Sequence, residues 1–296
     1  MRIAVTHSTI YRYDAPVYQE PHTFRLRPRE DGAQHLLSWA LEISPTPAGR
    51  TECLDQDGNV VVEAWFEGPL DQMAVKSSFT VETLRENPFD YQLSPLELAS
   101  LPMKYGEPLR SAMAPYLGAG KEAAAVRELA RSLAGETGWR TLPFLGALNT
   151  NLFERVRHVI RDGGLPLAPE VTLERGEASC RDLAVLFCAA CRAVGIPARF
   201  VSGYEREAAL QDQAHMHAWA EVYLPGGGWR GYDPSQGLAV YTAHVSVAAA
   251  ADPRLAAPVS GTFRGRAAVT MEFAIEMQVE ERASLDGSPE ARSSPK

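Results

Sequence analysis

Three side chains that can cooperate in nucleophilic catalysis occur in order along the second half of the chain: Cys180, His217 and Asp233. A cysteine nucleophile needs a base that takes its proton and returns it to a leaving group, and a third residue that fixes the tautomer of that base. These residue types therefore predict acyl transfer or amide hydrolysis through a thiol, if the fold brings them together.

Cys180 lies at the predicted start of a helix. Ser179 followed three residues later by Asp182, just before an apolar run, resembles a capping box, and Gly195 before Ile196-Pro197 is a typical stop. The pattern predicts a helix from about 180 to 194. In its first turn the free backbone N–H groups and the helix dipole stabilise an anion, which lowers the pKa of a thiol.

Two further cysteines, Cys188 and Cys191, follow in the same predicted helix. They lie among Phe187 and several alanines, where an apolar environment raises a thiol pKa. Their CxxC spacing has neither the position at a helix N-terminus that redox motifs use nor a second pair of ligands with zinc-like spacing. Packing is the favoured interpretation for both, whereas for Cys180 taken alone a buried packing role competes with catalysis.

His217 and Asp233 are predicted to lie on two antiparallel strands joined by a Pro-Gly-Gly-Gly turn at 225–228. Asp233 faces His217 directly if the turn is centred near Pro225, whereas a turn centred between Gly226 and Gly227 places Asp233 opposite Ala220. The register decides between these arrangements and is not fixed by the sequence.

Other interpretations of the histidines and aromatics were weighed. His215 and His217 have the spacing of two metal ligands on one strand face, but no third ligand stands at an expected spacing, so no metal and no cofactor is predicted. Trp219 shares a strand face with His217 and is the predicted wall of an acyl-binding site, with a packed core aromatic as the alternative. For Tyr204 and Trp229 the core interpretation is preferred.

The organisation of the chain predicts an α+β protein with a β-rich N-terminal domain. Residues 1–100 read mostly as strands: Leu37, Trp39, Leu41 and Ile43 alternate along one segment, as do Val75, Ser77, Phe79 and Val81 along another, and 57–59 reads as a turn before a β-branched run. Prolines at 88, 95, 102 and 108 predict an irregular linker.

Residues 101–281 are predicted to form the catalytic domain. Apolar residues at helical spacing predict one helix around 126–133 and a second from 145 to 159, and an alternating run at 269–279 predicts a C-terminal strand that we assign to this domain. The polar tail at 282–296 is predicted to be disordered.

Composition excludes several classes of function. With 29 Lys and Arg against 37 Asp and Glu the chain carries a formal charge of −8, and no basic stripe occurs, so nucleic acid is an improbable partner. No apolar run is long enough for a membrane span and no signal peptide is evident, which predicts a cytoplasmic protein with no membrane partner and free thiols. The sequence does not specify an oligomeric state.

The motifs around the three candidate residues resemble those of the bacterial transglutaminase-like superfamily. The segments "SCRDLAVLFCAACRAVGIPARFVSGYE" and "HAWAEVYLPGGGWRGYDPSQG" are similar to the Cys helix, GIPAR strand, HAW-E strand and GW-x-x-D-P strand of that family. "HSTIYRYDAPV", "FRLRPRE", Gln34 and "DQDGN" resemble its β-rich N-terminal region, and the resemblance covers roughly residues 1–280.

This resemblance implies a papain-like fold in which a Cys helix packs against an antiparallel sheet. It implies Cys180 as nucleophile, His217 as general base and acid, and Asp233 as the residue that orients His217, with no metal. The chain departs from the family where members commonly have an aromatic residue between the preceding helix and the Cys motif, since this chain reads "VIRDGG" there.

The function predicted from these observations is acyl transfer from a glutamine carboxamide or peptide-like amide, with a protein or peptide as substrate. A cysteine peptidase is the alternative within enzymes, because the same triad hydrolyses amides when water outcompetes amines. A non-catalytic binding protein that retains the fold is the alternative outside enzymes, and the presence of all three candidate residues argues against it.

Overall fold

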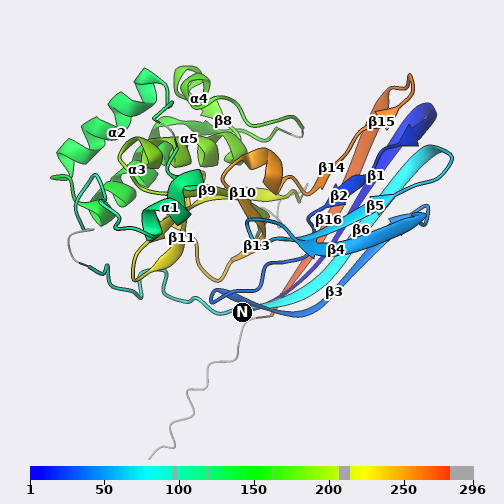
Figure 1. Cartoon of the computed structure of the whole chain (residues 1–296), viewed down its shortest axis with the longest axis horizontal. Coiled ribbons are helices and arrows are strands. Elements are labelled where there is room, and N and C mark those ends of the chain that lie inside the picture. Colours follow the sequence, from blue (N-terminus) through cyan, green and yellow to red (C-terminus); the bar gives the residue numbers. More distant parts are fainter. Residues whose placement is uncertain (96–98, 119, 162, 207–213, 281–296) are drawn as a thin grey trace, which may run out of the picture.

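The computed structural model describes residues 1–95, 99–118, 120–161, 163–206 and 214–280. Long strands form one half of the molecule, and helices packed on a shorter sheet form the other half (Figure 1). The predicted disordered tail at 282–296 lies outside the described residues. No helix in these ranges is long and apolar enough to cross a bilayer.

The N-terminal unit is built on a long antiparallel sheet. Its strands are β1 (Arg2–Gln19), β3 (Gln34–Ser44), β6 (Pro69–Thr83), β15 (Phe263–Arg264) and β16 (Val269–Glu280), with β1 between β6 and β16. A second sheet has the order β14 (Val259–Ser260), β2 (His22–Phe24), β5 (Val60–Trp65) and β4 (Gly49–Leu54). The predicted turn at 57–59 is confirmed, because Gly58 has a φ of 75° just before β5.

The C-terminal strand belongs to the N-terminal unit and not to the catalytic domain. β16 pairs along its whole length with β1, from Arg2 opposite Glu280 to Tyr13 opposite Val269. The assignment of 101–281 to one domain was therefore wrong at its C-terminal end, since an alternating pattern identifies a strand but not its partner.

Alternation also fails locally in β3. The pairing of β3 with β6 shifts between Leu36 and Ser38, so Leu37 is the extra residue of a β-bulge. Leu36 is consequently half-buried, whereas Leu37 is 40% exposed and does not share the inner face with Trp39, Leu41 and Ile43. In β6 the predicted inner face of Val75, Ser77, Phe79 and Val81 is confirmed.

Helices follow the proline-containing linker. They are α1 (Leu109–Met113), the 3-10 turn η2 (Ala114–Tyr116), α2 (Ala124–Glu136), α3 (Thr141–Arg155) and α4 (Pro169–Arg175). The predicted second helix ends four residues early, because residues after Arg155 become extended. There β7 (Arg157–His158) pairs in parallel with β8 (Glu177–Ala178), just before the Cys helix.

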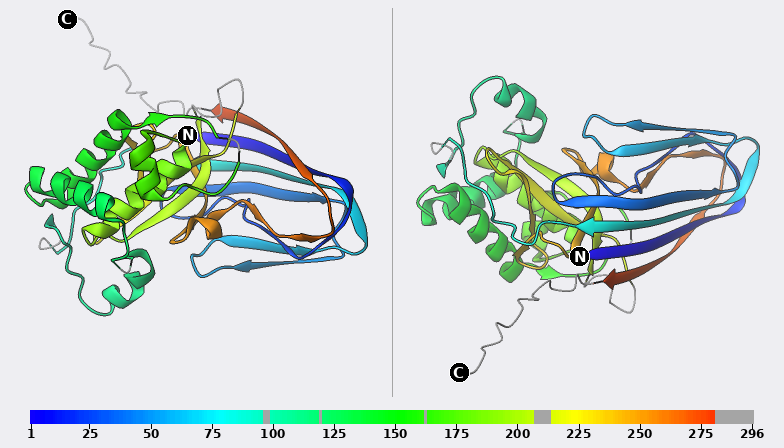
Figure 2. Two further views of the ribbon diagram at one scale, coloured as in Figure 1. Left: turned by 90° about the horizontal axis from the view of Figure 1, so that it is seen from above. Right: turned by 90° about the horizontal axis from the view of Figure 1, so that it is seen from below.

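The predicted catalytic unit consists of a five-stranded antiparallel sheet covered on both faces. Its order is β12 (Leu238–Ala239), β11 (Gly228–Asp233), β10 (His217–Leu224), β9 (Ala198–Glu205) and β13 (His244–Ala250). α5 (Cys180–Ala193) packs on β9 and β10, with α2, α3 and α4 around it (Figure 2). A short 3-10 turn, η3 (Pro253–Ala256), follows β13.

The two units share a hydrophobic cluster. Tyr204 and Val245 of the catalytic sheet pack with Ile3, Phe79 and Ile275 of the N-terminal unit. Every residue of β9 and β13 is buried, because helices cover one side of this sheet and the N-terminal unit approaches the other.

Two side-chain amides of the N-terminal unit hydrogen-bond the backbone of the edge strand β13. Gln34 accepts from the backbone N–H of Ser246 at 2.8 Å and donates to its carbonyl at 2.9 Å. Asn59 makes the same pair of bonds to Ala249, both at 2.9 Å. These bonds satisfy backbone groups at a sheet edge and hold the two units in a defined arrangement.

Candidate active site

Cys180 is the first residue of α5, as the capping pattern predicts. The Asp182 Oδ2 atom accepts from the Ser179 N–H at 2.9 Å and from its hydroxyl at 2.7 Å. Its Oδ1 atom accepts from the Leu167 N–H at 2.7 Å and from Arg161 at 2.6 Å. This buried carboxylate thereby fixes both the helix start and the loop that precedes it.

The hairpin register differs from both arrangements considered from the sequence. Ala220 pairs with Tyr232 and Leu224 with Gly228, so the turn is centred on Gly226. One residue further along, this register places Asp233 across from Trp219, which makes His217 a diagonal neighbour of Asp233 on the same sheet face.

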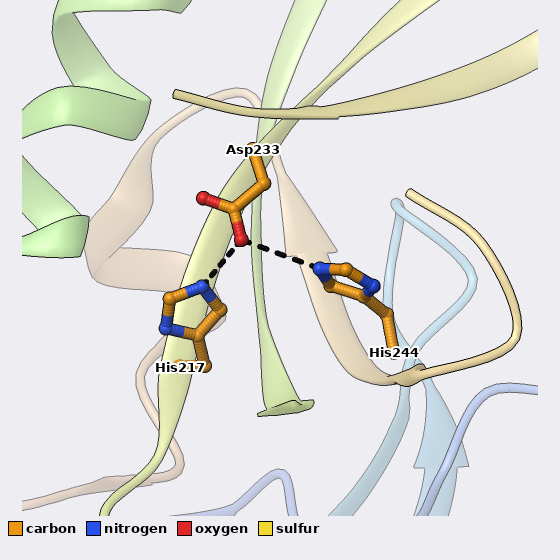
Figure 3. Close-up of side chains that lie close together, drawn as sticks. All are labelled: His217, Asp233 and His244. Atoms are coloured by element: carbon orange, nitrogen blue, oxygen red, sulfur yellow. Dashed lines mark hydrogen bonds and ion pairs between the residues drawn. The ribbon is translucent and has the colours of Figure 1, made fainter. Parts of the chain in front are cut away.

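The diagonal position brings the two side chains into direct contact. His217 Nε2 donates to Asp233 Oδ2 at 2.6 Å (Figure 3). The other carboxylate oxygen, Oδ1, accepts from the Ser235 hydroxyl at 2.6 Å and from its backbone N–H at 3.0 Å. His217 and Asp233 are both buried, so this charged hydrogen bond is shielded from water.

The electrostatics favour a thiolate paired with an imidazolium. Burial acts to raise the pKa of Cys180, but the charge of His217 and hydrogen bonds from His158 and His217 lower that pKa from 9.0 to about 6. Burial acts to lower the pKa of His217, but Asp233 and Cys180 raise it well above its ordinary value. The structure thus brings together the three predicted residues in the order Cys180, His217, Asp233.

His158 is a fourth residue of the site, and the sequence reasoning missed it. Its strand β7 is held beside the Cys helix, since the Val159 N–H donates to the Ala178 carbonyl at 2.9 Å. His158 lines the same cleft as Cys180, and its side chain hydrogen-bonds the thiol. The available signal was a histidine just before "VIRDGG", between the preceding helix and the Cys motif.

A second missed residue, His244, contacts the carboxylate from β13. His244 Nε2 donates to Asp233 Oδ2 at 3.3 Å, and the His244 side chain is fully buried (Figure 3). Nothing local in the sequence marks it, because it reaches Asp233 through the pairing of β13 with β9. Asp233 has a pKa well below its usual range because His217 and His244 outweigh the effect of burial.

The ligand-like spacing of His215 and His217 does not bring these two residues into one cluster of possible metal ligands. Both line the cleft, and His217 Nε2 is directed toward Asp233. Ligand atoms of His217, Asp233 and His244 do lie within 4.8 Å of one another. Both imidazoles already donate to one carboxylate oxygen, so a cation at this position must replace both hydrogen bonds.

Trp219 does not occupy its predicted position at an acyl site. It is 1% exposed and is absent from the cleft lining; it packs instead on His217 and His244, with ring centroids 6.3 Å and 5.2 Å away. Gly203 makes room for it, because a Cβ there would lie 2.7 Å from the indole ring. The alternation correctly placed Trp219 on the sheet face of His217, but its side chain is buried and does not reach the cleft.

The remaining candidates also occupy structural positions. Tyr204 is buried and hydrogen-bonds His7 Nδ1 at 2.7 Å, as the core interpretation predicts, whereas Trp229 is half-buried and stacks against the Arg199 guanidinium. Cys188 and Cys191 are buried within α5. All four cysteines are free thiols.

Cys180, His158 and His217 open onto a cleft of about 320 Å³. One wall comes from residues 160–161 and 163–166, and another from η3 and the residues after it. The third wall belongs to β1 and β16 of the N-terminal unit. A volume of this size suits a side chain or a short peptide segment.

Comparison with known families agrees with this geometry. The model of the bacterial transglutaminase-like N-terminal region matches residues 3–82, and that of the transglutaminase-like superfamily matches residues 127–234. The chain is a transglutaminase-like protein. The second match ends just beyond Asp233, so it includes all three predicted triad residues.

Two relatives of similar length are named as uncharacterized proteins. This transglutaminase-like protein is 26% identical to an uncharacterized protein of Mycobacterium leprae, over 93% of its own chain and 98% of the relative. It is 27% identical to an uncharacterized protein of Mycobacterium tuberculosis, over 88% of its own chain and 87% of the relative.

The crystal structure of an inferred cysteine protease from Cytophaga hutchinsonii superposes with a TM-score of 0.69 at 20% identity, over 96% and 92% of the two chains. The fold is therefore transglutaminase-like and papain-like.

Proposed function

We propose that this protein transfers acyl groups from a glutamine carboxamide, or a similar amide in a protein or peptide, through a thioester on Cys180. The observation that carries the proposal is that Cys180 and His217 line one cleft and that the buried Asp233 bonds His217. Membership of the transglutaminase-like superfamily supports the same chemistry.

In the first step the Cys180 thiolate attacks the amide carbon and forms the C–S bond. His217 Nε2 is bonded to Asp233, so the Nδ1 atom is the one available to the reacting groups. The imidazolium transfers its Nδ1 proton to the amide nitrogen, and the C–N bond breaks with release of ammonia or an amine. Asp233 keeps the ring in this orientation and stabilises its positive charge.

In the second step an acyl acceptor attacks the thioester. His217, now neutral, takes a proton from the incoming amine or water as the new bond forms, and the C–S bond breaks to regenerate the thiolate. An amine acceptor gives a substituted amide, whereas water gives a carboxylate. The chemistry of Cys180 is the same in both cases.

The N-terminus of α5 is suited to the oxyanion that forms in both steps. Cys180 is the first helical residue, so its backbone N–H has no partner within the helix. In this proposal that N–H donates to the oxyanion, and the loss of one such donor typically costs about 2.7–4 kcal/mol of transition-state stabilisation.

A direct test is ammonia release from a glutamine-containing peptide, with and without an added primary amine. We expect release by the intact chain, with incorporation of the amine into the peptide detected by mass spectrometry. Cys180→Ala is expected to abolish release, and Cys188→Ala serves as the matched control because it removes a thiol from the same helix. Release without incorporation identifies an amidase or peptidase, and no release from any amide contradicts the proposal.

A further inference from the structure

Strands β1 and β16 of the N-terminal unit contribute six side chains to the cleft that contains Cys180. They come as three cross-strand pairs of β1 and β16: His7 with Ile275, Thr9 with Phe273, and Tyr11 with Met271. Directly opposed residues of an antiparallel pair project from the same sheet face. The six side chains therefore form one continuous wall, named here the β1–β16 wall.

This wall becomes more exposed with distance along the strands. Ile275 is 9% exposed, Phe273 is half-buried and Met271 is 45% exposed. Phe200 and Met216 add further apolar surface to the same cleft. Partly exposed apolar side chains that converge in one concave site indicate a binding surface for an apolar group.

The charges around the cleft disfavour a cationic occupant. Among the described residues that line it there is no Asp or Glu, although the whole chain carries a charge of −8. The arginines of the lining are Arg161, Arg181 and Arg254. His7, at the inner end of the wall, is neutral because burial lowers its pKa to about 4.

We propose that the β1–β16 wall is the acyl-donor subsite and binds an aromatic or branched aliphatic side chain next to the amide that Cys180 attacks. This inference rests on the proposed function and specifies its substrate class. It also assigns a role to the N-terminal unit, which selects the substrate while the catalytic unit supplies the reacting groups. Burial of one such side chain corresponds to a preference of roughly 10- to 100-fold.

Thiol-directed probes test the subsite separately from the chemistry. We suggest three alkylating agents: iodoacetamide, which reports the nucleophile alone; N-benzyl chloroacetamide, which adds an aromatic arm; and N-(2-aminoethyl) chloroacetamide, which adds a cationic arm. The measurement is the second-order rate of Cys180 labelling in the full chain, divided by the rate of each probe with free cysteine. We expect the benzyl probe to exceed the aminoethyl probe by at least about tenfold.

The decisive variant is Phe273→Asp. It should bring the ratio of the normalised benzyl and aminoethyl rates to about one or below. Both rates are measured on the same Cys180 thiol, so a change in thiol reactivity cancels from that ratio. Glu272→Ala is the matched control, because Glu272 lies on the opposite face of the same strand with a side chain 67% exposed. It should change neither rate. Met271→Asp provides the same test at a more exposed position if Phe273→Asp does not fold.

Different failures have different meanings. Equal normalised rates for the two arms in the native chain, or an unchanged preference in Phe273→Asp, would overturn the subsite while leaving the nucleophile intact. Absence of rapid iodoacetamide labelling in the native chain would contradict the proposed function, and the subsite with it.

Discussion

The three cysteines of α5 share one helix and a buried environment, yet their surroundings have opposite effects. Cys180 lies at the N-terminus beside two imidazoles, which lower its pKa to about 6. Burial raises the pKa of Cys188 to about 11 and that of Cys191 well above its ordinary value. Burial is common to all three residues, so it does not determine reactivity; the helix terminus and the partner side chains do.

The largest predicted effect is the loss of the nucleophile. Cys180→Ala should reduce amide turnover to background, a change on the order of the 10⁶-fold loss that follows removal of a catalytic serine. Ammonia release measures it. Appreciable turnover in this variant would show that Cys180 is not the nucleophile, the role that distinguishes it from Cys188 and Cys191.

His217→Ala should nearly remove the difference between Cys180 and an ordinary thiol. If the pKa returns from about 6 to 9.0, the thiolate fraction at pH 6 falls from one half to about one thousandth, so alkylation slows by up to about 500-fold. The rate of iodoacetamide labelling at pH 6 provides the measurement. An unchanged rate is incompatible with activation by His217.

His158→Gln should raise the pH midpoint of Cys180 labelling by a smaller amount. His217, the other residue that lowers the pKa of Cys180, remains in this variant. We expect a roughly fivefold slower reaction at pH 6, which corresponds to a rise of about one unit in the pKa of Cys180. Arg157→Gln on the same short strand is the control, since its side chain is 72% exposed and pairs with Glu177. If both variants behave alike, His158 is not a partner of the thiol.

His244→Phe preserves an aromatic ring but removes the 3.3 Å hydrogen bond to Asp233. Loss of this charge-assisted bond should lower kcat about tenfold with little change in KM, because His244 acts through Asp233 and does not line the cleft. Tyr241→Phe, whose ring packs on His244, is the control. A role in packing alone would lower stability and leave the pH profile of kcat unchanged.

The smallest effect on reactivity is expected for Cys191→Ser. A hydroxyl at this buried apolar site should reduce the free energy of unfolding by about 1–3 kcal/mol, as measured by urea denaturation. The labelling rate of Cys180 should stay within twofold of the native rate. A large change in that rate would mean that the two ends of α5 are not independent.

The sequence predicted the parts of this site that depend on local patterns. The cap formed by Ser179 and Asp182 fixed the start of α5, and the alternation around His217 and Asp233 placed both on one hairpin. These signals are short-range: a capping residue, an apolar period and a turn. They are sufficient to position Cys180 at a helix terminus.

The missed features all depend on long-range pairing. His158 reaches Cys180 through a two-residue parallel ladder, and His244 reaches Asp233 from a strand whose partner is β9. Long-range pairing also determines three further features that the sequence did not predict. They are the pairing of β16 with β1, the bulge at Leu37 and the burial of Trp219. A strand pattern specifies which residues share a face, but register and partner are set by tertiary packing.

Selective activation of Cys180 is tested most directly by iodoacetamide labelling of Cys180, Cys188 and Cys191 in one native sample as a function of pH. Each site is quantified by mass spectrometry. A group whose pKa is lowered is deprotonated above that pKa, so labelling of Cys180 should rise with a midpoint near pH 6, while Cys188 and Cys191 stay unlabelled until the chain unfolds. Equal labelling of the three cysteines, or a midpoint for Cys180 near the ordinary value of 9.0, would contradict the account.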